Sequence, residues 1–514
     1  MSDRAVGYSF LHRELSLAVF APQMPARTSA VLRVIEQHDH LAVPEGVAPV
    51  PGATTLDHVL FALKHEGVDL QILSGALRAV PHDIMLAEVN RMPSGAYIRK
   101  ACFLWEHFNQ RELAGAPSVG GANADLFDSE RYITQPGTIS KKWRVHFNGF
   151  GNLNYCPIVR RTSAIKVLLK GDFLDRLNGF VKITDPVMLD RALSWAYLGE
   201  TEGSFAIERE TPSVQKRERF VELLRRAHET RPVDEAYLVE LQNAMIDNPH
   251  NQAVQFRVEQ NRLVNGRTVT YLPPPPDLDA ELMEHLMEMA NQAPKTANPI
   301  IAASLSCFGF VFLHPFMDGN GRISRFLFHK ALCDSGSLPS GLLLPISVAI
   351  KKHEREYLAA LQSFSRIARS FWQVGDLSGG LYDQKFIGSD AIYRYWDATP
   401  CVEFAYTMAQ EALEQHLLHE VRMLTAHDRI KSEVDDAYDV RGDTLSLLIF
   451  ASLDHQGRIS NNLRRKFVHA VPGEVMDLIE QISHDSLESH VEQKDEATDS
   501  HVSSQHLNRE TPSC

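Results

Sequence analysis

A short polar loop between two apolar helical patterns constrains this chain more than any other stretch. An apolar run at 304–313 predicts a buried helix, and the apolar spacing after the loop predicts a second helix that begins near Arg322. Pro315 helps to end the first helix, because proline breaks a helix interior. Gly319 and Gly321 allow positive φ and the close approach of a ligand. Because N–H groups at a helix N-terminus favour anions, the stretch predicts an anion-binding loop.

The polar side chains of this loop suit phosphate chemistry. His314 can act as a neutral base near pH 7. Asp318 offers the hard oxygen atoms that Mg²⁺ shares with phosphates. Arg322 and Arg325 lie three residues apart, so they share a helix face and can hold phosphate oxygens through paired N–H groups. A helix-capping loop with solvated arginines is the alternative interpretation of the same residues.

Residues 314–325 resemble the signature of the Fic family, His-Pro-Phe-x-Asp/Glu-Gly-Asn-Gly-Arg-x-x-Arg, and match every defined position. The resemblance extends over about residues 187–375 and implies a mainly α fold, a Fic-type helical core with a small β-hairpin flap. It implies transfer of AMP from ATP, the co-substrate, to a Ser, Thr or Tyr hydroxyl of a protein, which includes the chain itself. His314 is then the catalytic base and Asp318 the Mg²⁺ ligand. The nucleotide-binding residues implied are Gly319, Asn320, Gly321, Arg322 and Arg325.

A second motif lies at the end of a helix expected over 187–210. Ser204 and Glu208 are four residues apart and therefore neighbours on one helix face. The stretch resembles the inhibitory motif found upstream of the core in many Fic proteins, Ser/Thr-x-x-x-Glu followed by Gly or Asn. Arg209 stands where Gly or Asn is usual, so this helix end departs from the pattern. The resemblance implies a bidentate pair between Glu208 and Arg325 that restrains the enzyme; an exposed acidic helix end is the alternative.

The region before the core motif predicts a β-hairpin. Asn265-Gly266 is a strong turn signal, and Val-, Thr- and Tyr-containing segments flank it. The prolines of 273–276 form a rigid extended run, and the apolar residues of 282–289 predict a helix. This arrangement resembles the Fic flap, which holds a target segment by main-chain pairing. A linker is the alternative for the proline run.

Patterning divides the chain into five regions. We predict a mostly helical N-terminal region (1–140), a connecting segment with a small hairpin near Trp143 (141–186), the core with inhibitory helix and flap (187–375), a helical C-terminal module (376–483) and a disordered tail (484–514).

The predicted C-terminal module is compatible with a winged helix. Ser460 precedes a basic helix that holds the cluster 464–466, and an apolar helix comes before it. A solvated basic face is the alternative. The net charge of -13 provides no overall attraction to nucleic acid, so we expect nucleic-acid binding only through a terminal module.

Cysteine usage and hydropathy indicate a cytoplasmic protein. The six cysteines include no Cys-x-x-Cys pair, which suits a reducing compartment and argues against a disulfide scaffold and a structural zinc site. No stretch is long and apolar enough to predict a membrane span. The sequence leaves open whether the chain forms a homo-oligomer.

Three other functions stay open on sequence alone. A Doc-like protein kinase binds the nucleotide in reverse, but such relatives carry Lys where this chain has Gly321. A de-AMPylase would use the same residues to hydrolyse an AMPylated protein. A non-catalytic regulatory binding protein would carry the site as a vestige.

Overall fold

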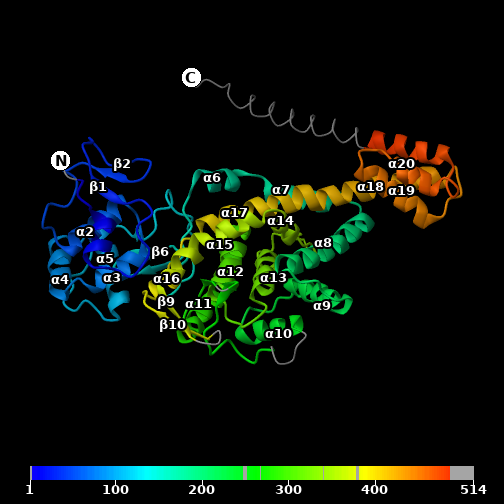
Figure 1. Cartoon of the computed structure of the whole chain (residues 1–514). Coiled ribbons are helices and arrows are strands. Elements are labelled where there is room, and N and C mark those ends of the chain that lie inside the picture. Colours follow the sequence, from blue (N-terminus) through cyan, green and yellow to red (C-terminus); the bar gives the residue numbers. More distant parts are fainter. Residues whose placement is uncertain (1–2, 247–251, 267, 340, 378–380, 487–514) are drawn as a thin grey trace, which may run out of the picture. The chain divides into compact units, whose positions relative to one another are not determined.

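The computed structural model describes residues 3–246, 252–266, 268–339, 341–377 and 381–486. Helices dominate it and every strand is short, which confirms the expected mainly α fold (Figure 1). Contacts divide the chain into two compact units. The first unit contains 1–178 and 197–412, and the second contains 179–196 and 413–514.

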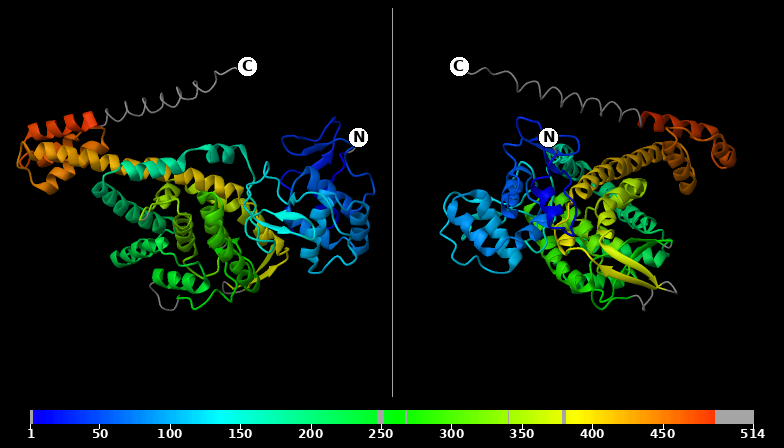
Figure 2. Two further views of the ribbon diagram at one scale, coloured as in Figure 1. Left: turned by 180° about the vertical axis from the view of Figure 1, so that it is seen from behind. Right: turned by 60° about the vertical axis from the view of Figure 1, so that its left-hand side comes forward.

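The helix that precedes the motif forms the centre of the first unit. This helix, α12 (Pro299–Leu313), begins at Asn298, whose side chain accepts from the N–H groups of Ile300 and Ile301. It is buried along nearly its whole length because α11 (Pro276–Thr296), α13 (Asn320–Asp334) and α17 (Thr399–Glu411) pack around it (Figures 1 and 2). Burial on all sides explains why its sequence is apolar without a helical stripe.

Further helices surround α12 in the first unit. The inhibitory motif lies near the end of α8 (Pro186–Ile207), which runs without interruption. The others are α9 (Val214–Arg225), the short η1 (Arg226–His228), α10 (Glu235–Met245), α14 (Ile346–Lys352), α15 (Glu354–Arg369) and α16 (Ala391–Arg394).

Two hairpins lie against α15 and its surroundings. β7 (Leu263–Asn265) and β8 (Thr268–Tyr271) pair antiparallel on either side of Gly266, as the Asn-Gly signal predicts. The second hairpin, β9 (Trp372–Leu377) with β10 (Leu381–Phe386), was not predicted. Its Trp372 clusters with residues of the flap, so the predicted boundary at 376 cuts through a strand of the core unit.

The N-terminal region is less helical than predicted. Its helices are α1 (Gly7–Glu14), α2 (Thr55–His65), α3 (Leu70–Arg78), α4 (His82–Arg91) and α5 (Ala96–Asn109). Residues 26–43 of the region predicted to be mostly helical form a sheet of order β1-β3-β2; its strands are β1 (Ala26–Thr28), β2 (Ile35–Glu36) and β3 (Leu41–Val43). These strands are too short to show an alternating pattern.

Regular structure also lies around and within the predicted connecting segment. β5 (Thr138–Ser140) and β6 (Val145–Phe147) form the expected hairpin, and β4 (Ala124–Asp125) pairs with β6 in parallel. Two helices that sequence reasoning missed follow, α6 (Ser163–Lys170) and α7 (Phe173–Ile183).

The second unit is helical in its described residues. The π-helical turn η3 (Ala412–Leu417) leads into α18 (Leu418–Asp435), and α19 (Gly442–Asp454), α20 (Asn461–Phe467) and a helix at 473–486 follow. Residues 413–486 contain no strand, so they have no β-wing and the winged-helix prediction is wrong.

The basic cluster of this unit is partly neutralised within the unit. Arg464 pairs with Asp477 at 2.8 Å and with Glu480 at 2.7 Å. Ser460 caps α20 as expected. The predicted disordered tail overlaps the last helix at 484–486, and its remainder lies outside the described residues. In the described part of the chain, no helix has the length and apolar character needed to cross a bilayer.

Candidate active site

His314 occupies the turn at which α12 ends. Its φ of 58° is left-handed, and its N–H closes the helix on the carbonyl of Phe310 at 2.8 Å. Nδ1 lies 3.1 Å from the carbonyl oxygen of Val311. A carbonyl can only accept, so Nδ1 carries the proton and Nε2 keeps its lone pair. Burial lowers the pKa of His314 to about 4, so the ring is neutral at physiological pH.

A buried arginine that sequence reasoning missed supports this turn. The side chain of Arg257 is fully buried, and its Nε donates to the carbonyl of His314 at 2.9 Å. Its Nη2 donates to the carbonyl of Pro274 at 2.7 Å and pairs with Asp279 at 3.4 Å. Arg257 therefore fixes the flap and the histidine turn to each other. Burial raises the pKa of Asp279 to about 7, against the lowering effect of Arg257.

The glycines of the loop have separate roles. Gly319 has a φ of 87° and forms the N-cap of α13, as its positive-φ prediction requires. The first helical bond runs from Ile323 N–H to the Gly319 carbonyl, so the N–H groups of residues 320–322 lie before the hydrogen-bonded ladder. Gly321 is helical, contrary to the prediction of positive φ.

Asn320 holds the loop together. Its Oδ1 accepts from Phe316 N–H at 3.0 Å, and its Nδ2 donates to the Phe316 carbonyl at 2.7 Å. Both polar atoms of the amide therefore bond the main chain. The implied role of Asn320 in nucleotide binding stays a prediction.

Asp318 presents a carboxylate to the cavity. Its side chain is half exposed, Oδ1 accepts from Gly319 N–H at 2.6 Å, and Arg322 Nη2 lies 3.6 Å away. A partly exposed carboxylate beside an anion-binding loop is a chemically suitable donor for Mg²⁺ shared with phosphates.

The predicted contact between the inhibitory motif and the core is present. Arg325 Nη2 lies 2.9 Å from Glu208 Oε1, and the Ser204 hydroxyl accepts from Arg325 Nε at 2.8 Å. A single pair of atoms joins the two charged groups, so the prediction of a bidentate pair is wrong. A Cβ at Gly321 would lie 2.1 Å from Glu208 Oε1, which shows that this carboxylate lies directly against the start of α13.

The end of α8 explains how Arg209 replaces the usual glycine. Glu210 N–H donates to the Phe205 carbonyl at 3.0 Å and Arg209 N–H to the Ala206 carbonyl at 3.1 Å. This bond pair is the Schellman ending, which requires a left-handed residue. Arg209 adopts it with a φ of 58°.

A second acidic contact at this helix end was not predicted. Arg322 Nη1 donates to Glu210 Oε2 at 3.0 Å. Both motif arginines thus pair with carboxylates from the end of α8. Glu210 is visible in the sequence two residues beyond Glu208, but only the Schellman turn aims it at the motif.

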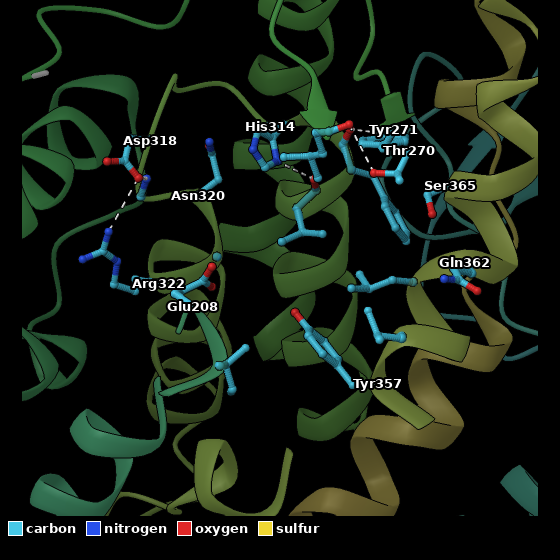
Figure 3. A pocket seen from close by; sticks show the side chains of 18 of the residues that line it. Glu208, Thr270, Tyr271, His314, Asp318, Asn320, Arg322, Tyr357, Gln362 and Ser365 are labelled. Carbon is cyan, nitrogen blue, oxygen red and sulfur yellow. Dashed lines mark hydrogen bonds and ion pairs between the residues drawn. The ribbon is translucent and has the colours of Figure 1, made fainter. Parts of the chain in front are cut away.

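One cavity of about 720 Å³ is lined by the motif loop and by both carboxylates beyond α8, and its lining includes His314, Asp318, Arg322, Glu208 and Glu210. The motif loop and the α8 end form one side, and the flap and α15 form the other (Figure 3). Glu208 lies near Arg322, while Gln362 and Ser365 lie across the cavity from them (Figure 3). Tyr357 also borders it, and burial raises the pKa of its hydroxyl.

Known proteins are similar to this chain over part of its length. Residues 232–332 match the model of the Fic/DOC family. Residues 232–332 are therefore similar to a Fic domain. The chain is 36% identical over 67 residues to Protein adenylyltransferase Fic of Nematostella vectensis, which covers 13% of this chain and 16% of that protein. It is 26% identical over 168 residues to Protein adenylyltransferase fic-1 of Caenorhabditis elegans, covering 32% of this chain and 31% of the relative.

These matches span less than a third of each curated Fic relative. Among solved structures, the chain is similar to a Fic family protein from Desulfovibrio desulfuricans, with 19% identity and a TM-score of 0.39. That match covers 62% of this chain and 87% of the other.

Proposed function

We propose that this chain is a protein adenylyltransferase that transfers AMP from ATP to a hydroxyl group of a protein. The relatives named protein adenylyltransferase support nucleotidyl transfer at the level of the family. The observation that carries the proposal is the convergence of the unprotonated Nε2 of His314 and the N-terminus of α13 on one cavity. A base and an anion site side by side are what an attack on phosphate needs.

The reaction follows from these positions. The target hydroxyl oxygen bonds to the α-phosphorus of ATP, the bond from that phosphorus to the bridging oxygen breaks, and pyrophosphate leaves. His314 Nε2 takes the hydroxyl proton. The N–H groups at the start of α13 donate to phosphate oxygens as negative charge develops on them. Asp318 would hold Mg²⁺, which neutralises phosphate charge when bound.

Glu208 restrains this activity in the proposal. Its carboxylate lies at the start of α13 and pairs with Arg325, so an anion already occupies the place where the outer phosphates would be held. The Glu208 carboxylate and an outer phosphate of ATP are both negative, so they would repel each other strongly if both occupied that place. ATP then binds the resting protein in a non-productive pose.

The test is a transfer assay with ATP, Mg²⁺ and a cell lysate, followed by intact-mass analysis of labelled proteins. We expect Glu208→Gly to raise self-labelling or target labelling roughly tenfold or more, which corresponds to about 1.4 kcal/mol of released restraint. His314→Ala, introduced into the Glu208→Gly protein, should lower the labelling rate by on the order of 10²–10⁴-fold. Addition of a phosphate in place of an adenylyl group would identify a kinase. Equal labelling by wild type and Glu208→Gly would refute the restraint.

A further inference from the structure

The residues around the contact between Glu210 and Arg322 differ from those around the contact between Glu208 and Arg325. The Arg322 side chain is 4% exposed, and Glu210 Oε2 lies 3.0 Å from its Nη1. The guanidinium also lies over the Phe205 ring, 5.2 Å from the centroid. Lys216 Nζ approaches the same carboxylate at 3.3 Å. Arg322 is therefore contacted by Glu210 and by the Phe205 ring, and Glu210 is a closer anion to it than Asp318, which lies 3.6 Å away.

The helix ending determines why two carboxylates reach two arginines. Arg322 and Arg325 are three residues apart on α13, so they point in similar directions. Glu208 directly follows the last residue of α8, Ile207, and the left-handed turn at Arg209 brings Glu210 back toward the same face. Glu208 then pairs with Arg325, and Glu210 pairs with Arg322.

We propose that Glu210 is a second, independent lock of the site, which keeps Arg322 from the outer phosphates of a nucleoside triphosphate. The inference rests on the proposed function, because it assigns Arg322 to phosphate binding. Loss of the Glu208 contact alone then frees Arg325, while Arg322 stays paired with Glu210. Full access for a triphosphate requires that both carboxylates leave.

The experiment measures binding rather than transfer. Affinities for a non-hydrolysable ATP analogue and for AMP, each with Mg²⁺, are compared in wild type, Glu208→Gly, Glu210→Gln and the double variant. The glutamine keeps the size of the side chain and removes its charge. The double variant should bind the analogue about two- to fivefold more tightly than Glu208→Gly, the range expected for loss of a partly exposed ion pair. AMP, which has no outer phosphate, should bind both variants equally.

Glu202→Gln is the matched control, because Glu202 lies on α8 but pairs with Arg217 at 3.1 Å and not with a motif arginine. It should leave both affinities unchanged in the Glu208→Gly background. Equal affinity of Glu208→Gly and the double variant for the analogue would overturn the lock. Equal tightening of AMP and the analogue would also overturn it, since a general charge effect would then suffice. If the analogue tightens as expected while no variant transfers AMP, the lock stands and the proposed function fails.

Discussion

Arg209 has strained backbone at the end of α8, and its replacement by glycine should measurably stabilise that helix end. A residue with a side chain in the left-handed region costs roughly 1–2 kcal/mol, and glycine escapes this cost. Glycine in turn destabilises the folded state by about 0.5–1 kcal/mol, because it gives the unfolded chain more conformational freedom. The Arg209 side chain is exposed. Arg209→Gly should therefore stabilise the α8 end by about 0.5–1 kcal/mol.

Hydrogen exchange of a peptide around the α8 end can detect this change. The N–H groups of Arg209 and Glu210 form the Schellman bonds, so they report the opening of the turn directly. The expected stabilisation slows their exchange about two- to fivefold. Arg209→Ala is the control, because alanine keeps the Cβ and with it the strain. Exchange that is unchanged or faster in Arg209→Gly, or equally slowed in Arg209→Ala, would refute the explanation.

Three further predictions concern the site. Because His314 must be neutral to accept a proton and its pKa is about 4, activity of the Glu208→Gly protein should fall only as pH drops through about 4; a limb near pH 6.5 in the pH–rate profile would contradict this. Asp318→Ala and excess EDTA should each abolish transfer, and undiminished activity in EDTA would exclude the metal role. Arg257→Ala leaves Asp279 buried without its partner, so chemical denaturation should show a loss of about 3–5 kcal/mol; a loss under about 1 kcal/mol would show that Arg257 does not support the turn.

The parts of the site that the sequence predicts are those formed by residues that follow one another in the chain. The loop from His314 to Gly319 follows from local backbone rules, since proline, glycine and helix-end preferences act within a few residues. The flap turn at Gly266 follows from the same kind of rule. The family resemblance predicted the contact between Glu208 and Arg325. Its distance could be obtained only from the structure, because the two residues are far apart in sequence.

The missed parts depend on tertiary contacts. Arg257 belongs to no periodic pattern, and its partners are carbonyl groups brought to it by the flap and α12. The main-chain role of Asn320 depends on the curvature of the loop. The strands at 26–43 are only two or three residues long, so no alternation was there to detect. The pairing of Arg464 with Asp477 was not predicted for the basic cluster 464–466, because Asp477 reaches Arg464 only after the chain folds back.

The buried face between α8 and α13 limits how the site can open. Glu200 is fully buried two turns before Glu208, and it accepts from Ser347 N–H at 2.7 Å and lies 3.0 Å from His329 Nε2. Sliding α8 would strip these partners from a buried carboxylate, which costs roughly 1–3 kcal/mol or more. Swinging Glu208 away from Arg325 breaks a contact whose acidic side chain is 37% exposed. The lower cost lies with the helix end, so we expect α8 to stay in register while its last turn and the side chains beyond it release the arginines.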